Sequence, residues 1–562
     1  MLPVKMSLCT ATRYAFPKLP HFLRSSSPSI IYSSAYYSNP KFFAHFQTQN
    51  ANTIHDSVAS FNRLLHMHPP PSIVQINKIL GSLVKDKHNR IVISLFAQAE
   101  FRGFTPNLVT LNILINCYCY LGQMYSAFSM SGKIFKVGLQ PDTVTLNTLI
   151  RGLCIGKQVG EALDFYDDLM DKGFQLDTVC YAILINGLCK IGKIGSAIKL
   201  VRKMERQLIK PDVVIYNTII DSLCKVGHVI QAYELRSKMI DQGILPNIVT
   251  YNSLIHGHCC KRQWHEASQL LLEMMFLDIQ PNIYTFNILI GMFCKRGRMI
   301  EAQAMLARMM KCDERPDVVT YNSLMDGYCL MNNVNESKEV FNKMVQSGLI
   351  PNLVSFNVLI DGLCKIKMVD EAMALFKELR RKNVNPNIWT YNSLIDGMCK
   401  LGRMSCVQDL VDDMRDNSIA PDVVTYNVLL DAFCKSQNID KGIALFQQMV
   451  AQGVQPNLRT LNILLDGLCK GHRLNDAWEI FRYLLMKGFH LDVYTYSIMI
   501  NGLCRQGLLD EAMTLLPRMK ENDCLPNLVT YKILLQALLE KSENKKVENL
   551  LHEMIDNGSL KQ

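Results

Sequence analysis

The segment VVTYNVLLDAFCKSQNIDKGIALFQQMVAQGVQPN, residues 423–457, decides the fold, because its pattern occurs fourteen times in the chain. Each copy is 35 residues long, and the copies follow one another without an insertion or a deletion from Ile73 to Gln562. A fixed period of this length is typical of solenoids, in which a unit buries its apolar face only by stacking on its neighbours. The sequence therefore predicts one continuous array, and we number the positions of each unit from 1 to 35.

Two apolar stripes in the quoted unit predict two α-helices. Their members recur at three- and four-residue spacing, which places each set on one face of a helix. The stripes are Tyr426, Leu429, Leu430 and Phe433, and Ile439, Ile443, Phe446 and Met449. Position 31 is Gly in eight units and position 34 is Pro in eleven, and both residue types end a helix. We therefore expect an all-α fold of helical hairpins, preceded at residues 54–72 by the second half of a degenerate unit.

The first 50 residues differ in composition from the array. They hold five basic residues, no acidic one and many serines, which is typical of an organellar transit peptide. A disordered N-terminal tail is the alternative. The net charge of the chain is +10, so the rest of it carries about +5, a mild excess that suits an RNA partner. No apolar run reaches the ~18 residues that cross a bilayer, so membrane insertion is not expected.

Twelve of the nineteen cysteines fall at position 12 of a unit, from Cys119 to Cys504. A small apolar thiol that recurs with the period of the fold indicates packing between helices in a reducing compartment. The chain contains no CxxC pair. The nearest approach to a metal cluster is His256, His258, Cys259 and Cys260, which cannot all point the same way on one helix. No metal site and no cofactor are predicted.

Position 5 holds an unexpected polar residue. Asn in the interior of a helix costs about 0.5 kcal/mol relative to Ala, so its repeated use requires a recurring hydrogen-bond partner. That partner is either a neighbouring hairpin or a ligand. The residues at position 5 are Asn77, Asn112, Asn147, Asn217, Asn252, Asn287, Asn322, Asn357, Asn392, Asn427 and Asn462, with Ser497 in the thirteenth unit.

Position 35 is Asp or Asn in thirteen units. Such a residue directly before a helix is a favourable N-cap, worth about 1 kcal/mol. Capping alone would also accept Ser or Thr, which do not occur at this position, so capping and ligand recognition both remain open as explanations. The residues are Asn107, Asp142, Asp177, Asp212, Asn247, Asn282, Asp317, Asn352, Asn387, Asp422, Asn457, Asp492 and Asn527.

Position 13, at the end of the first helix, is basic in nine units. Cations are favourable at a helix C-terminus in any case. Equivalent positions of a solenoid nevertheless form a row, and a row of cations beside a row of amides is similar to a phosphate track beside base-reading groups. The candidate phosphate-binding residues are Lys85, Lys190, Lys225, Lys295, Lys365, Lys400, Lys435, Lys470 and Arg505.

These residues occur in strings such as VVTYNSLMDGYC (318–329) and LVSFNVLIDGLCKIKMVDEAMALFKEL (353–379). The strings resemble the pentatricopeptide repeat in its pure 35-residue P class, over about 490 of the 562 residues. The NxLIDGLCK-like first helices also resemble the restorer-of-fertility-like subgroup of plant mitochondria. The resemblance implies a right-handed superhelical solenoid that binds single-stranded organellar RNA without catalysis of its own.

The resemblance carries further implications. One RNA base is read per repeat by positions 5 and 35, flanked by position 2, which is mostly Val here with Tyr284, Trp389, Arg459 and Tyr494 as exceptions. By the family's rules, Asn with Asp favours uracil, Asn with Asn accepts either pyrimidine, and Ser with Asn favours adenine. The expected target is 5′-YUUNYYUYYUYUAN-3′, with Y for a pyrimidine and N for any base. The units with Ala182 and Lys532 at position 5 give no assignment.

The implied role is transcript processing, stabilisation or translational silencing in the mitochondrion, or alternatively in the chloroplast, with a nuclease as a possible protein partner. A protein-binding scaffold, as in the related 34-residue tetratricopeptide arrays, is the main alternative function. An intrinsic nuclease is a second one. The sequence lacks the zinc-deaminase signature and the G-x-x-x-x-G-K-[ST] and G-x-G-x-x-G phosphate loops, so neither an enzyme nor a small-molecule substrate is expected.

Overall fold

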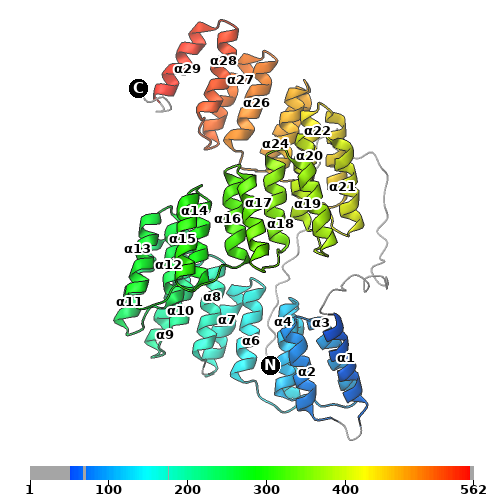
Figure 1. Cartoon of the computed structure of the whole chain (residues 1–562), viewed down its shortest axis with the longest axis vertical. Coiled ribbons are helices and arrows are strands. Elements are labelled where there is room, and N and C mark those ends of the chain that lie inside the picture. The colour runs from blue at the N-terminus through cyan, green and yellow to red at the C-terminus, as the bar shows by residue number, and fades with distance from the viewer. Residues whose placement is uncertain (1–50, 68–70, 175, 557–562) are drawn as a thin grey trace. The chain divides into compact units, whose positions relative to one another are not determined.

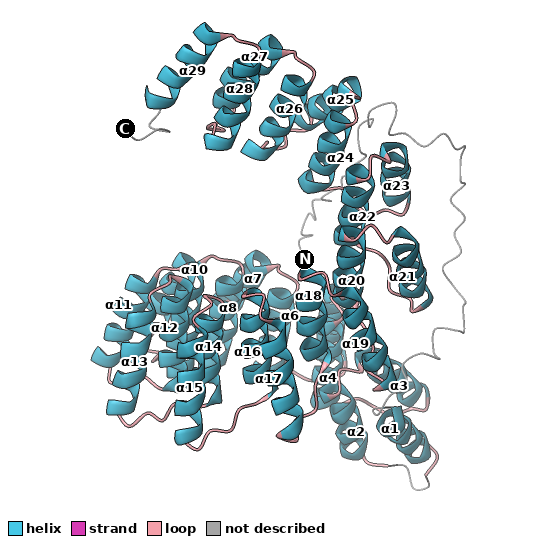
Figure 2. Ribbon diagram, turned by 45° about the horizontal axis from the view of Figure 1, so that its top comes forward, coloured by secondary structure: helices cyan, strands magenta, loops and turns pink. Residues whose placement is uncertain are grey.

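The computed structural model describes residues 51–67, 71–174 and 176–556, and every regular element in these residues is an α-helix (Figures 1 and 2). Helix α1 (Ala51–Leu65) is followed by fourteen hairpins of a first and a second helix. The first helices are α2 (Ile73–Lys85), α4 (Leu108–Tyr120), α6 (Thr143–Ile155), α8 (Thr178–Lys190), α10 (Val213–Val226), α12 (Ile248–Cys260), α14 (Ile283–Cys294), α16 (Val318–Leu330), α18 (Leu353–Lys365), α20 (Ile388–Lys400), α22 (Val423–Lys435), α24 (Leu458–Lys470), α26 (Val493–Arg505) and α28 (Leu528–Glu540). The second helices are α3 (Asn89–Phe101), α5 (Met124–Lys136), α7 (Val159–Asp171), α9 (Ile194–Arg206), α11 (Val229–Asp241), α13 (Trp264–Phe276), α15 (Met299–Lys311), α17 (Val334–Gln346), α19 (Val369–Arg381), α21 (Met404–Asp416), α23 (Ile439–Ala451), α25 (Leu474–Met486), α27 (Leu509–Glu521) and α29 (Asn544–Asp556). A first helix begins every 35 residues, which confirms the predicted array of helical hairpins.

The turns at both ends of the second helix use left-handed backbone. Position 31, after this helix, has φ between 55° and 85° in all thirteen units where it is described, even at Leu208 and Ser418. Position 15, between the two helices, also has positive φ in every unit, including Gln437 at 62°. A left-handed residue ends a helix and reverses the chain. At position 31 the frequent Gly predicts a left-handed residue. Position 15 is more often a non-glycine residue, and its left-handed backbone was not predicted from the sequence.

The apolar stripes form the core of each hairpin. In the unit at residues 423–457, seven of the eight stripe residues are buried, and Phe433, near the end of α22, is partly exposed. Tyr426 is 1% exposed, and its hydroxyl donates to Oε1 of Gln452 at 2.7 Å. Tyr216 makes the same bond to Gln242 at 2.7 Å. A buried tyrosine therefore ties the first helix to the end of the second one.

The position-12 cysteines pack against small residues of the next unit. A Cβ added to Gly257 would lie 2.8 Å from both Cβ and Sγ of Cys224, and one added to Gly467 would lie 2.5 Å from Sγ of Cys434. All cysteines in the described part of the chain are free thiols. This contact explains why a small apolar residue recurs at position 12, because the first helices of adjacent units approach closely there.

The described chain forms two compact bodies. One contains the units up to residue 293 together with residues 300–316, and the other contains residues 294–299 and the units from residue 317 onward. Within each body, the first helices of adjacent units pack on one another, as α10 does on α12 and α22 on α24 (Figure 1). Equivalent positions of the first helices therefore form rows along one face of each body.

Two predictions concern localisation and membranes. Residues 1–50, on which the transit-peptide prediction falls, lie outside the described residues. Within the described residues, none of the helices combines the length and the apolar character that crossing a bilayer requires.

Candidate nucleic-acid interface

The position-5 asparagines connect neighbouring hairpins. Nδ2 of Asn217, in α10, donates to Oδ1 of Asn247 at 3.0 Å. Asn247 directly precedes α12, so this bond joins the first helix of one unit to the start of the next. The same bond, 3.0–3.4 Å long, occurs in at least seven units of the part of the chain that the structure describes. The bridge between hairpins, one of the two explanations that the sequence left open, is therefore present.

The position-35 residues cap the first helices. In all thirteen units with Asp or Asn at this position, the side chain accepts a hydrogen bond from the backbone N–H at position 3 of the next unit. Asp142, for example, accepts from Thr145 at 2.8 Å. Burial tends to raise the pKa of Asp142, but the hydrogen bonds from Thr145 and Asn112 lower that pKa below its ordinary value. Position 35 thus has a structural role.

A third member of this network, at position 3, was not predicted from the sequence. Thr250 is fully buried, and its hydroxyl donates to Oδ1 of Asn217 at 2.6 Å. Thr145 contacts Asn112 in the same way at 2.7 Å. Threonine occupies position 3 in ten units, and that recurrence was the available signal.

In Asp142 and Asn247, the structural bonds leave one polar atom of the side chain unused. Oδ1 receives the capping bond and the amide of position 5, so Asp142 keeps Oδ2 and Asn247 keeps Nδ2 without a partner among the described residues. Nδ2 of Asn217 also retains a second N–H, because it makes a single hydrogen bond. An Asp at position 35 therefore presents an acceptor, and an Asn presents a donor.

Position 2 forms a row of exposed apolar side chains beside these polar groups. The exposed fraction is 50% at Val249, 61% at Tyr284 and 64% at Trp389. Tyr494 is also exposed, as is Arg459, the charged exception. Apolar groups exposed at every repeat of a folded array mark a surface that binds something.

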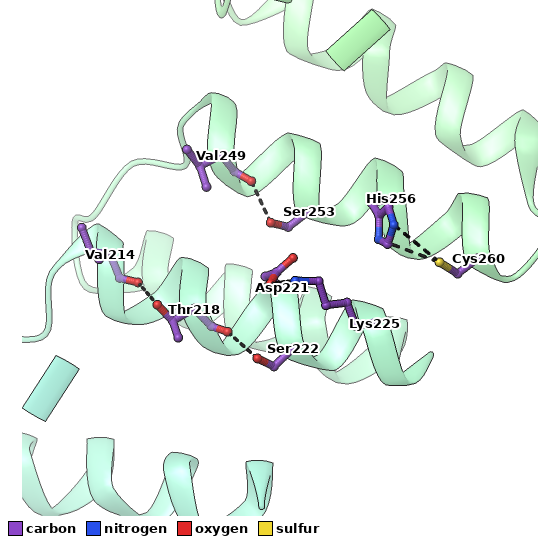
Figure 3. Close-up of polar contacts among 9 residues, drawn as sticks. All are labelled: Val214, Thr218, Asp221, Ser222, Lys225, Val249, Ser253, His256 and Cys260. Atoms are coloured by element: carbon purple, nitrogen blue, oxygen red, sulfur yellow. Dashed lines mark hydrogen bonds and ion pairs between the residues drawn. The ribbon is translucent and has the colours of Figure 1, made fainter. Parts of the chain in front are cut away.

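Positions 2, 5, 9, 13 and 35 meet in one groove of the body that ends at residue 316. The groove has a volume of about 560 Å³, and its lining includes Val214, Val249, Asn217, Asn252 and Lys225. Figure 3 shows its wall: the Thr218 and Ser253 hydroxyls donate to the carbonyls of Val214 and Val249 at 2.8 and 2.9 Å. Each position-6 hydroxyl is thus engaged by a backbone carbonyl of its own helix and is less available to a ligand. The side chains of positions 2, 5 and 35 are then the main groups that the groove offers.

The position-13 cations divide into two groups. Five lysines donate to an Asp at position 9 of the same helix at 2.5–2.6 Å, namely Lys225, Lys365, Lys400, Lys435 and Lys470. The other four, Lys85, Lys190, Lys295 and Arg505, are exposed and have no Asp or Glu at position 9. Five of the nine candidate phosphate-binding residues are therefore partly neutralised by carboxylates of their own helix.

The fourth unit interrupts the network. Position 5 of this unit is Ala182, which has no amide. Position 3 of the next unit is Ile215, which has no hydroxyl to donate. In the third unit Asn147 is present at position 5, but the residue that follows at position 3 of the fourth unit is Cys180 instead of a threonine whose hydroxyl could donate to it. Oδ1 of Asn147 is buried without a hydrogen-bond partner, and the same atom is unpartnered in Asn252, Asn322 and Asn427, although Thr or Ser follows at position 3 there. One of the two units without a base assignment therefore also has an irregular hydrogen-bond network.

The histidines and cysteines at the end of α12 point in different directions. His258 is buried and contacts the Tyr233 hydroxyl and Oε1 of Gln263, both at 3.0 Å. His256 lines the groove, with Nδ1 3.8 Å from Sγ of Cys260 (Figure 3). These residues do not converge on one point.

Family models match almost the whole array. The PPR repeat family matches in twelve overlapping segments between residues 106 and 540, and a PPR repeat model matches residues 529–559. The chain belongs to the PPR repeat family. The units from residue 108 to residue 559 are therefore pentatricopeptide repeats.

Individual relatives match over shorter stretches. A mitochondrial pentatricopeptide repeat-containing protein of Arabidopsis thaliana is 35% identical over 83 residues, which are 15% of this chain and 13% of that protein. A second Arabidopsis pentatricopeptide repeat-containing protein is 31% identical over 137 residues, 21% of this chain and 26% of the other. These matches span only a small part of either relative.

A solved structure shares the fold over most of the chain. The maize pentatricopeptide repeat protein PPR10, in complex with an 18-nt psaJ RNA element, has a TM-score of 0.50 and 22% identity. The similarity covers 91% of this chain and 84% of PPR10. It shows that the pentatricopeptide arrays have the same fold.

Proposed function

We propose that this protein binds single-stranded RNA sequence-specifically through the face formed by its first helices. The observation that carries the proposal is the pairing of positions 5 and 35, which at Asn217 and Asn247 leaves one defined hydrogen-bonding atom, Nδ2 of Asn247, beside the exposed position-2 side chain of Val249. A planar base can be held between apolar position-2 residues while its edge meets these polar atoms. The complex of PPR10 with RNA supports the same use of the fold.

The atoms at position 35 account for discrimination between pyrimidines. The free Oδ2 of an Asp, as in Asp142, accepts the N3–H of uracil and repels the N3 acceptor of cytosine. The free Nδ2 of an Asn, as in Asn247, donates to either pyrimidine. The proposed target is therefore 5′-YUUNYYUYYUYUAN-3′, read one base per repeat from the N-terminal repeat onward.

The proposed cellular role is to process, stabilise or silence an organellar transcript. The protein acts by occupying RNA and not by catalysis of its own, and a nuclease is a proposed partner for processing. Two observations support a plant mitochondrial protein of the P class and the restorer-of-fertility-like subgroup: the unbroken 35-residue period, and Arabidopsis relatives that are named as mitochondrial. The basic, serine-rich residues 1–50 support an organellar transit peptide.

Binding to RNA oligonucleotides tests the proposal. The purified chain should bind a 14-mer of the predicted sequence at least about tenfold more tightly than a 14-mer in which purines replace the pyrimidines, a difference of about 1.4 kcal/mol. Binding should weaken as salt rises, because phosphate contacts release counterions. Equal affinity for both oligonucleotides would contradict sequence-specific reading. No binding to either one, together with capture of a protein partner by the same face, would favour the scaffold function.

A further inference from the structure

The charge of the first-helix face changes along the array. From the ninth to the twelfth repeat, position 9 is Asp361, Asp396, Asp431 and Asp466, and each carboxylate accepts from the position-13 lysine of its own helix at 2.5–2.6 Å. The lysine side chains are 40–69% exposed. These pairs therefore lie on the surface, at the positions where phosphates are expected to pass.

The pairs also influence one another across repeats. The hydrogen bond to Asp431 is the main cause that raises the pKa of Lys435, and the carboxylates of Asp396 and Asp466 in the adjacent repeats act in the same direction. Lys435 thus has carboxylates of the adjacent repeats on both sides. The result is a ladder of alternating charge with little net positive potential.

The first four repeats lack these position-9 carboxylates. Position 9 is Gly81, Asn116, Arg151 and Asn186, so the ladder has no carboxylate there. Lys85, Arg151 and Lys190 are exposed, and none of the three has an ion-pair partner among the residues that the structure describes. Basic residues outnumber acidic ones by seven in residues 73–317, whereas acidic residues exceed basic ones by two in residues 318–562.

We infer that the position-9 aspartates neutralise the position-13 lysines for RNA, so that the first repeats supply most of the electrostatic attraction to the phosphates. This inference rests on the proposed RNA binding and goes beyond it. A phosphate that approaches a Lys–Asp pair is repelled by the carboxylate as it is attracted by the ammonium, and exchange of one anion for the other releases few counterions. The unpaired cations of the first repeats have no such competitor.

The C-terminal repeats hold RNA by different groups. Trp389 and Tyr494 are exposed at position 2 by 64% and 61%, in the tenth and thirteenth repeats. Base stacking on an aromatic ring contributes about 1–3 kcal/mol and depends little on salt. The 5′ part of the RNA is therefore held mainly by charge, and the 3′ part by stacking and base-edge contacts.

Three variants of the whole chain test this division, because the chain offers a matched pair of repeats. Lys190→Gln in the fourth repeat leaves Asn at position 9 and Gln at position 13. The double variant Asp396→Asn/Lys400→Gln gives the tenth repeat the same two residues. Asp396→Asn alone gives the tenth repeat the Asn–Lys pair that the fourth repeat has naturally. Affinity for the 14-mer is measured across a salt series, with the melting temperature as a control for folding.

The three variants have different expected results. Lys190→Gln should weaken binding about fivefold at 0.1 M salt and lower the salt slope by about 0.7, the value for one lost phosphate contact. The double variant should bind within about twofold of the original protein. Asp396→Asn alone should tighten binding about fivefold and raise the slope by about 0.7, equally for cognate and non-cognate RNA, because phosphate contacts carry no sequence information.

Two outcomes would overturn parts of the account separately. A loss in the double variant as large as that in Lys190→Gln would show that Lys400 binds phosphate despite Asp396, and would refute the inference while leaving RNA binding intact. Failure of the original protein to bind RNA at any salt concentration would refute the proposed function itself.

Discussion

Nδ2 of Asn217 donates to Oδ1 of Asn247 at 3.0 Å, and this same oxygen accepts the backbone N–H of Thr250, in the first turn of the next repeat's helix. The bond fixes the orientation of the Asn247 amide, so that Nδ2 and not Oδ1 is directed away from the network. The structural role and the proposed recognition role therefore use different atoms of one side chain. A residue at position 35 can cap a helix and still contribute a specific donor or acceptor to a ligand.

The buried Oδ1 of Asn147 predicts a stabilising substitution. Cys180→Thr places a hydroxyl where Thr145 and Thr250 bond the equivalent asparagine in other repeats. Satisfying this acceptor should raise the free energy of unfolding by about 1 kcal/mol. Chemical denaturation of the two proteins measures the difference. Ile215→Thr is the control, because Ala182 offers no amide to bond, and it should not stabilise the protein.

The contact between Gly257 and Cys224 predicts a destabilising substitution. A Cβ at Gly257 would lie 2.8 Å from Cβ of Cys224 and 3.2 Å from its Cα, so Gly257→Ala should separate α10 from α12 and cost about 1–3 kcal/mol. Gly442, inside α23, is the matched control, since the nearest atoms to its added Cβ are at 3.8 Å. Gly442→Ala should stabilise by about 0.5–1 kcal/mol through helix propensity. Thermal unfolding of both variants would show opposite shifts, and a destabilised Gly442→Ala protein would contradict the packing argument.

The buried thiols predict a loss of stability at high pH. Burial raises the pKa of Cys224, Cys364, Cys434 and Cys469 from 9.0 to about 12. Between these values the folded protein binds more protons than the unfolded chain, so stability is complete below pH 9 and falls as pH rises toward 12. The denaturation midpoint should be flat from pH 7 to 8.5 and decrease above pH 9. The control is Cys434→Ala, whose alkaline decrease should be smaller than that of the original protein.

The sequence predicted the hairpins and the positions of the candidate interface because a solenoid repeats each local signal. The stripe from Tyr426 to Leu430, the caps at position 35 and the Pro at position 34 occur so often that their period identifies them. The interactions between repeats were harder to predict. Thr250 bonds an asparagine 33 residues earlier, and only the recurrence of Thr at position 3 could have signalled that bond. The left-handed residue between the two helices is a non-glycine residue in eight repeats, such as Gln437, so residue type alone did not indicate its backbone geometry.

The alternating charges of positions 9 and 13 were also only partly predictable from the sequence. Asp431 and Lys435 are four residues apart on one helix, and their pairing is a common local interaction. Its effect on the face depends on Asp396 and Asp466, which only the stacking of repeats brings near. The sequence alone predicts a row of cations similar to a phosphate track, and the structure adds that several of these cations are paired with carboxylates.

A change of base preference at one repeat tests the central claim most directly. Asn322 and Asn352 form the eighth pair, with Nδ2 of Asn322 3.4 Å from Oδ1 of Asn352. The double variant Asn322→Thr/Asn352→Asp retains a capping oxygen before α18 and changes the exposed atoms. Its affinity is measured for four 14-mers that differ only at the eighth nucleotide. The account predicts that the preference moves from pyrimidine to guanine while the melting temperature stays within a few degrees of the original value. An unchanged preference at the eighth nucleotide, in a protein that still folds and binds RNA, would contradict it.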